Sequence, residues 1–189
     1  VTEKLNEGTD IAYSYLSAYT LTANVENGFI AATGAANLTG NSLNNTLYAG
    51  LGNNVLTGGG GSDTVSYLYG VTGTTGVTVG LADGGAQTTV GSGSDTLSGI
   101  RNLTGSANAD RLTGNVLANV LDGGAGADIL TGSDGSDTYY VRDAGDVVTE
   151  TNVVSSTGGT DIAYSYLAAY TLTANVENGR ILATGAANL

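Results

Sequence analysis

Apolar side chains recur every nine residues in two stretches of the chain. From residue 105 the chain is GSANADRLT, GNVLANVLD, GGAGADILT, GSDGSDTYY, VRDAGDVVT, and the eighth places hold Leu112, Leu121, Leu130, Tyr139 and Val148. From residue 31 it is AATGAANLT, GNSLNNTLY, AGLGNNVLT, GGGGSDTVS, and the eighth places hold Leu38, Leu47, Leu56 and Val65. A period of nine matches neither the 3.6-residue period of a helix nor the two-residue alternation of a strand.

Each nonapeptide divides into about six turn-forming residues and three extended ones. Two such half-coils make an 18-residue coil, whose apolar residues point inward while successive coils stack as parallel strands about 4.8 Å apart. The sequence therefore predicts an all-β fold, a right-handed parallel β-roll or β-solenoid built from nonapeptide half-coils, with flanking β segments. Its core is thin, so we expect a further source of stability beyond apolar burial.

The segments outside the nonapeptides also carry strand patterns. Ile11, Tyr13 and Tyr15 alternate with smaller residues, and Val77 and Val79 alternate ahead of a turn signal at residues 83–84. These segments are expected to form wider coils of the roll, or a hairpin that leans on it. A separate nonapeptide, VGSGSDTLS, occupies residues 90–98.

A long repeat relates the two ends of the chain. DIAYSYLSAYTLTANVENG at residues 10–28 returns as DIAYSYLAAYTLTANVENG at residues 161–179, an offset of 151. We divide the chain into a β segment completing a preceding unit (1–30), a first nonapeptide block (31–66), a connecting segment (67–89), a second nonapeptide block (90–149) and the start of the next unit (150–189). At 18 residues per coil, one unit would rise roughly 40 Å. The chain begins at Val1 and contains no Met, which favours a fragment or a processed segment.

Acidic residues follow the same nine-residue phase. The sixth places of the second block hold Asp110, Asn119, Asp128, Asp137 and Asp146. In an 18-residue coil, Asp110, Asp128 and Asp146 share one edge, and Asn119 and Asp137 share the other. Stacked carboxylates repel unless a cation lies between them.

Oxygen ligands from two Asp side chains and from turn carbonyls suit calcium, which takes six or more, better than magnesium, which keeps its waters. We predict several calcium ions. The predicted ligands are Asp63, Asp95, Asp110, Asp128, Asp137, Asp146, Asn54 and Asn119, with turn contributions from Gly123, Ala125, Gly132 and Asp134. The first block carries Ala36, Asn45 and Asn54 at the sixth place, so we expect it to bind little calcium except near Asp63.

Composition excludes several functions. The chain has no Cys and no His, which removes thiol and imidazole catalysis and the usual zinc sites. Seventeen acids against five bases give a net charge of -12, so no basic surface for a nucleic acid can form. No apolar run is long enough for a membrane span. Acids that recur every nine residues indicate a metal or turn role rather than a catalytic dyad, and we predict no enzymatic activity.

The tyrosines Tyr13, Tyr15 and Tyr19 and their copies allow two interpretations. They could form a stacking platform for sugars, but cross-strand packing is the more common reason for such a pattern. The off-phase acids Asp122, Asp134 and Asp143 are expected to be solvated turn residues or Asx turns, and the Arg residues to balance local acids.

The nonapeptides GGGGSDTVS and GGAGADILT resemble the RTX, or hemolysin-type calcium-binding, repeat GGxGxDxUx, with GSDGSDTYY and VGSGSDTLS as near matches. The resemblance implies a parallel β-roll with calcium between its turns, which folds in calcium-rich surroundings after type I secretion.

Together these features predict a calcium-stabilised structural repeat segment of a large secreted bacterial surface protein, such as an adhesin stalk, surface-layer or filament subunit. One alternative is an accessory or secretion module of a type I-secreted enzyme or toxin, and another is a carbohydrate-binding β-roll. The expected partners are calcium and identical units, with glycans under the last alternative. The expected location is extracellular or at the bacterial cell surface.

Overall fold

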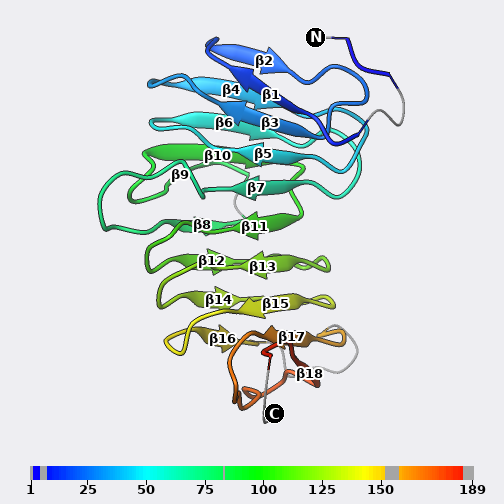
Figure 1. The fold of residues 1–189 in the computed structure, drawn as a ribbon, viewed down its shortest axis with the longest axis vertical. Helices are drawn as coiled ribbons and strands as arrows, with labels where there is room; N and C mark the ends of the chain where they lie inside the picture. Colours follow the sequence, from blue (N-terminus) through cyan, green and yellow to red (C-terminus); the bar gives the residue numbers. More distant parts are fainter. Residues whose placement is uncertain (1, 5–7, 83, 152–157, 185–189) are drawn as a thin grey trace.

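The computed structural model describes residues 2–4, 8–82, 84–151 and 158–184, and these form strands and no helix. The strands stack into a tall solenoid with two sheet faces (Figure 1). The first face is one parallel sheet of β1 (Ile11–Ser14), β3 (Asn27–Ile30), β5 (Thr46–Tyr48), β7 (Thr64–Ser66), β11 (Asn102–Thr104), β13 (Val120–Asp122), β15 (Thr138–Val141), β17 (Ile162–Ser165) and β18 (Asn178–Ile181). The predicted all-β parallel β-solenoid is confirmed.

The second face is divided into two sheets. One sheet orders β2 (Ala18–Thr20), β4 (Ala36–Thr39), β6 (Asn54–Thr57), β10 (Ser94–Ser98) and β9 (Ala86–Thr88). The other orders β16 (Val147–Thr149), β14 (Ile129–Thr131), β12 (Arg111–Thr113) and β8 (Thr78–Gly80). All pairs on this face are parallel except that of β9 with β10.

The core follows the eighth place of the nonapeptides. Leu103, Leu121 and Tyr139 are partners across β11, β13 and β15, so consecutive coils are 18 residues apart. Leu112 and Leu130 are partners on the opposite face. Each of these five side chains is at most 1 % exposed. The inward side chains of the eighth place therefore form the regular part of the interior, as the period predicts, and other buried residues such as Tyr67 and Val141 add to it.

Residues 67–101 break the sequential stacking order. β8 follows β7 in sequence, yet it pairs with β12, while the later strand β10 pairs with β6. β10 therefore lies above β8 in Figure 1, and β9 runs back between them. Both predicted arrangements occur here, because β8 joins the roll as a coil strand and β9 with β10 forms an antiparallel hairpin. The predicted turn at 83–84 lies partly outside the described residues.

A side chain bridges the gap between the two sheets of the second face. The Gln87 side-chain carbonyl accepts a hydrogen bond from the backbone N–H of Gly80 at 2.8 Å, and its Nε2 donates to the Gly80 carbonyl at 2.8 Å. The amide of Gln87 thus makes the pair of hydrogen bonds that a backbone peptide would make. It connects β9 to β8 where the ladder is interrupted.

The two copies of the repeated stretch pair their first and last strands in the same register, although β2 of the first copy has no counterpart strand in the second. Ile11 is the partner of Asn27 between β1 and β3, and Ile162 is the partner of Asn178 between β17 and β18. From β1 to β17 there are seven strand-to-strand steps along the first sheet. At about 4.8 Å per step, a unit rises about 34 Å. The value of roughly 40 Å expected from length alone is wrong, because residues 67–101 use extra chain without adding coils in proportion.

None of the described segments forms a helix that is long and apolar enough to cross a bilayer.

Candidate metal centre

The sixth-place side chains form a ladder of hydrogen bonds along one edge of the roll. Asn119 donates its backbone N–H to Asp137 Oδ1 at 2.7 Å, and Asp137 donates its own to Asp161 Oδ1 at 2.7 Å. Higher in the stack, the Asn45 N–H donates to Asp63 Oδ1 at 2.7 Å. Each acid therefore binds the backbone of the coil before it, and the predicted sharing of an edge by Asn119 and Asp137 is confirmed.

The opposite edge carries a second ladder of the same kind. Asp110 N–H donates to Asp128 Oδ1 at 2.8 Å, and Asp128 N–H donates to Asp146 Oδ1 at 3.1 Å. The Asn54 N–H donates to Asp95 Oδ1 at 2.7 Å. Asp95 of the separate nonapeptide at residues 90–98 thus binds the backbone of a neighbouring coil as the other acids of this ladder do. The predicted alignment of Asp110, Asp128 and Asp146 is thus confirmed.

Three of the six sixth-place acids that are predicted ligands have both carboxylate oxygens bound by protein donors. Asp146 Oδ2 accepts from the N–H groups of Arg142 and Asp143, at 2.8 and 2.9 Å. Asp110 accepts from Val77 N–H and from Ser106. Asp95 Oδ2 accepts at 3.1 Å from the Thr89 hydroxyl. These carboxylates stabilise turns, and little of their bonding capacity remains for a cation.

The other three acids each present a buried oxygen to the turn. Among the described residues, Oδ2 of Asp63, Asp128 and Asp137 has no hydrogen-bond donor, and each side chain is at most 1 % exposed. Asp128 Oδ2 points at Gly123, where a Cβ would overlap it, and Asp63 Oδ2 points at Gly58 in the same way. A buried anionic oxygen without a donor is unfavourable unless a cation binds it. These residues therefore fit the oxygen-ligand chemistry of calcium.

Electrostatics distinguish the ladder acids from ordinary carboxylates. Burial raises the pKa of Asp128 to about 7, with further contributions from the charges of Asp146 and Asp110. Burial also raises the pKa of Asp137 to about 7, and the charge of Asp161 adds to it. Burial raises the pKa of Asp63 too. Ionised carboxylates at these positions need a compensating positive charge near neutral pH.

The remaining predicted ligands lie in different environments. Gly123 and Gly132 are buried beside Asp128 and Asp137, which is where a turn carbonyl could reach an ion, whereas Ala125 is exposed. Asp134 is partly exposed. The Asn119 side chain is fully engaged, since Oδ1 accepts from Asn115 N–H and Nδ2 donates to the Arg101 carbonyl.

Asn54 differs from Asn119, because neither side-chain amide atom has a hydrogen-bond partner in the described part of the chain, although the residue is 1 % exposed. The Asn54 amide is thus available to a ligand.

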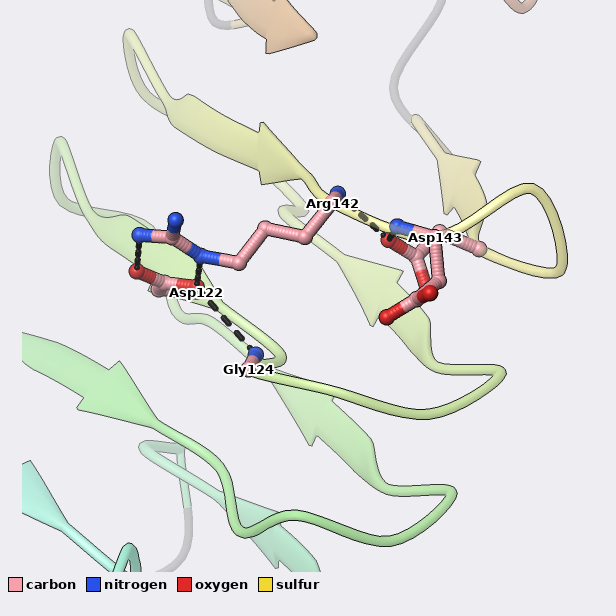
Figure 2. A network of polar contacts seen from close by, with 5 residues as sticks. Asp122, Gly124, Arg142 and Asp143 are labelled. Carbon is pink, nitrogen blue, oxygen red and sulfur yellow. Dashed lines mark hydrogen bonds and ion pairs between the residues drawn. The ribbon is translucent and has the colours of Figure 1, made fainter. Parts of the chain in front are cut away.

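An ion pair links coils outside the ladder. Arg142 donates from Nε and Nη2 to the two oxygens of Asp122, at 2.7 Å each (Figure 2). Asp122 Oδ1 also accepts from the Gly124 N–H at 3.2 Å, and Asp143 Oδ2 accepts from the Gly126 N–H at 3.1 Å. Asp122 forms an Asx turn with Gly124, which is one of the two predicted roles, and Asp143 binds the turn at Gly126 in the neighbouring coil. The Arg142 guanidinium lies over the Tyr166 ring, 4.6 Å from its centre.

Two acidic residues near the ladder escaped the sequence analysis. Asp161 and Glu150 lie beside Asp137, and one carboxylate oxygen from each of the three is within 4.8 Å of the others. Asp161 follows Asp137 by 24 residues instead of 18, so the nine-residue phase does not reach it. Glu150 is two residues after the inward-facing Val148 on an extended segment, and this alternation is the signal that could have found it.

The fold and the ladders define the class: a parallel repeat solenoid whose turns are joined through stacked acids. The model of the RTX calcium-binding nonapeptide repeat matches the chain in four copies, over residues 38–67, 104–139 and 113–148. These segments are RTX repeats, so the predicted resemblance is confirmed for them, and the repeat family implies calcium binding. This repeat family is structural rather than catalytic. Residues 90–98 lie outside the matched ranges. No curated protein matches the chain significantly.

Proposed function

We propose that this chain is a calcium-stabilised structural segment of a large secreted bacterial surface protein, built from tandem 151-residue units. The observation that carries the proposal is the identical register of β1–β3 and β17–β18. Since β17 stacks directly on β15, a following unit continues the same sheet without a linker. An adhesin stalk, a surface layer and a filament all need a continuous rod of this kind.

The contrast between the two copies supports end-to-end continuation. Tyr15, which directly follows β1, is 77 % exposed. Its copy Tyr166 is covered by the Arg142 guanidinium and is 42 % exposed. The Tyr164 ring stacks on Tyr140 at 5.6 Å, and its copy Tyr13 is 60 % exposed. A preceding unit would cover Tyr13 and Tyr15 as β15 covers their copies. The exposed tyrosines of the first copy then serve as a junction between units.

Within this proposal the ladder acids have two roles. Asp63, Asp128 and Asp137, each with a buried oxygen free of donors, are calcium ligands together with turn carbonyls. The other three predicted acids, Asp95, Asp110 and Asp146, hold turns in place through backbone and hydroxyl donors. Two of the three proposed ligand acids lie in the second block, as the sequence indicates.

Circular dichroism and small-angle scattering test the proposal. The metal-stripped chain is expected to lose strand signal and expand, and calcium is expected to restore both, because a site assembled only in the folded state couples binding to folding. A chain extended by one more 151-residue unit is expected to be longer by about 34 Å in calcium. Circular dichroism spectra that are the same with and without calcium would contradict the role of calcium. An extended chain that bends or collapses between units would contradict the proposal of a continuous rod.

A second candidate function rests on the aromatic row of the first sheet. The Phe29 ring lies 5.2 Å from Tyr13, 5.9 Å from Tyr48 and 5.6 Å from Tyr69. The predicted cross-strand packing of Tyr13 is thus present. The same row is also a surface on which sugar rings could stack. Glycan-array binding that is lost in Tyr69→Ala, but kept in Tyr166→Ala as the control outside this row, would favour carbohydrate binding.

A further inference from the structure

Three carboxylates meet in the interior where β17 joins the roll. Asp137, Glu150 and Asp161 are 1 %, 6 % and 2 % exposed, and one oxygen of each lies within 4.8 Å of the others. Glu150 is not a nonapeptide ligand, since it follows the last repeat. The cluster therefore shares Asp137 with the turn sites that the repeat pattern describes and adds two acids from outside that pattern.

Two of the oxygens in this cluster have no donor among the described residues. Asp137 Oδ1 accepts from Asn119 N–H, but its Oδ2 has no partner. Glu150 Oε1 accepts from the Tyr139 hydroxyl, but its Oε2 has none. Both side chains aim at one point, because a Cβ on Gly132 would overlap Asp137 Oδ2, Glu150 Oε1 and the Tyr139 hydroxyl. Only glycine fits at position 132, because any side chain there would collide with these three oxygens.

The spacing suits a calcium ion. Ligand oxygens lie about 2.3–2.6 Å from calcium, so two oxygens on opposite sides of one ion are at most about 5 Å apart. The three carboxylate oxygens of this cluster lie within 4.8 Å of one another, close enough to share one ion. Three buried carboxylates carry up to three negative charges, and a divalent cation offsets most of that repulsion. Burial and the charges of Asp161 and Asp137 raise the pKa of Glu150 to about 8, as expected for a buried carboxyl group beside two other carboxylates.

We propose that Asp137, Glu150 and Asp161 bind a calcium ion that joins consecutive 151-residue units. Asp137 and Glu150 precede the second copy of the repeated stretch, and Asp161 is the first residue of that copy. The ion therefore holds the start of the second copy to the last coil of the first unit. The site needs only this chain, whereas its role as a joint rests on the tandem array proposed above.

Asp10 provides a matched control within the chain. It occupies the position of Asp161 in the first copy, and its N–H donates to Glu26 as the Asp161 N–H donates to Glu177. Asp10 is only half-buried, and although its Oδ2 also has no donor, no described residue beside it is the equivalent of Asp137 or Glu150. Asp161→Asn and Asp10→Asn thus make the same chemical change in the same local backbone, with and without the other two carboxylates.

Native mass spectrometry and calorimetry with calcium count the ions bound by the full 189-residue chain. Glu150→Gln and Asp161→Asn are each expected to bind one ion fewer than the wild type, and Asp10→Asn the same number. Equal ion number and affinity in all four proteins would overturn the proposal. If the wild type binds one ion, and both variants lose it, the joint site stands and the turn-site proposal fails. A wild type that binds none refutes both.

A second measurement covers the case in which a variant does not fold. Terbium replaces calcium at oxygen sites, and its emission is excited through nearby tyrosine. Tyr139 touches Glu150, so Tyr139→Phe, which keeps the buried ring, is expected to lower the terbium emission of the folded chain, while Tyr15→Phe on the exposed edge leaves it unchanged. Equal emission from both variants and the wild type would place no ion beside Tyr139 and overturn the proposal.

Discussion

Replacing Asp128 by Asn is expected to change the stability of the roll in opposite directions with and without calcium. The raised pKa of Asp128, about 7 against an ordinary 3.8, means that the folded state binds a proton more tightly than the unfolded state. In the metal-free protein, the contribution of Asp128 to the free energy of unfolding is therefore fully present below about pH 4 and is lost as the pH rises through about 7. A difference of about 3 in pKa corresponds to about 4 kcal/mol. Since neighbouring acids titrate in the same range, we expect about 2–4 kcal/mol.

Asparagine at position 128 removes this pH-dependent loss of stability, because it carries no charge, and it preserves the hydrogen bond of the ladder. Its Oδ1 can still accept the Asp110 N–H, and its amide N–H can donate to a turn carbonyl, as that of Asn119 does. At pH 8 without metal, Asp128→Asn is thus expected to be more stable than the wild type by about 2–4 kcal/mol. At pH 5 the gain should fall to less than half. With calcium the variant should be the less stable protein, because it lacks an anionic ligand.

Urea unfolding followed by circular dichroism measures these differences in metal-stripped protein at pH 5 and pH 8, and at pH 8 with calcium. Asp146→Asn is the matched control on the same edge. The Asp146 carboxylate accepts three backbone N–H groups, so its replacement is expected to destabilise the roll in both media. If Asp128→Asn destabilised the metal-free protein at pH 8 as much as it does with calcium, the burial argument would be refuted.

Three further changes test the core, the bridge between sheets and the turns. Leu121→Ala is expected to lower the free energy of unfolding by about 2–5 kcal/mol in urea titrations, because the side chain is fully buried. Gln87→Ala removes both hydrogen bonds to Gly80 and is expected to cost about 1–3 kcal/mol by the same assay; a change below about 0.3 kcal/mol would contradict the bridge. Gly123→Ala places a methyl group against Asp128 Oδ2, so calorimetry is expected to show weaker calcium binding, and unchanged affinity would contradict a site at that turn.

The nine-residue period was sufficient to predict most of the core and both ladders. Leu121 and Asp128 occupy different places of the repeat, and each has the environment that its place predicts, because a regular coil repeats the same environment every 18 residues. Such prediction works where every coil has the same length. It needs no knowledge of long-range contacts, since each coil touches only its neighbours.

The same period could not predict which ladder acids retain a free oxygen. Asp110 and Asp128 are equivalent in phase, yet Ser106 satisfies Asp110, while Gly124 provides no hydroxyl at the corresponding place for Asp128. The difference comes from one side chain in the turn. The sequence contains that side chain, but its orientation toward the carboxylate depends on the folded turn.

The stacking order of residues 67–101 was also beyond the pattern. Val79 and Leu97 both carry strand signals, and nothing local indicates that the later one lies above the earlier one in the stack. In this order, the side-chain amide of Gln87 makes the two hydrogen bonds to Gly80 that a neighbouring backbone strand would otherwise make. The periodicity of the sequence does not predict this role. Glu150 and Asp161 were missed for a related reason, because the coil length changes where they approach Asp137.

The exchanged positions of β8 and β10 have a consequence for how the roll comes apart. In a simple solenoid each coil can be lost from an end without disturbing distant ones, so stability is local. Here β10 completes the upper stack from a point in the chain beyond β8, while β8 begins the lower stack. Neither block can unravel as far as this crossing without removing a strand from the other. We expect the two nonapeptide blocks, residues 31–66 and 90–149, to unfold in one cooperative transition. The loss of an ion from one block would then lower the stability of both.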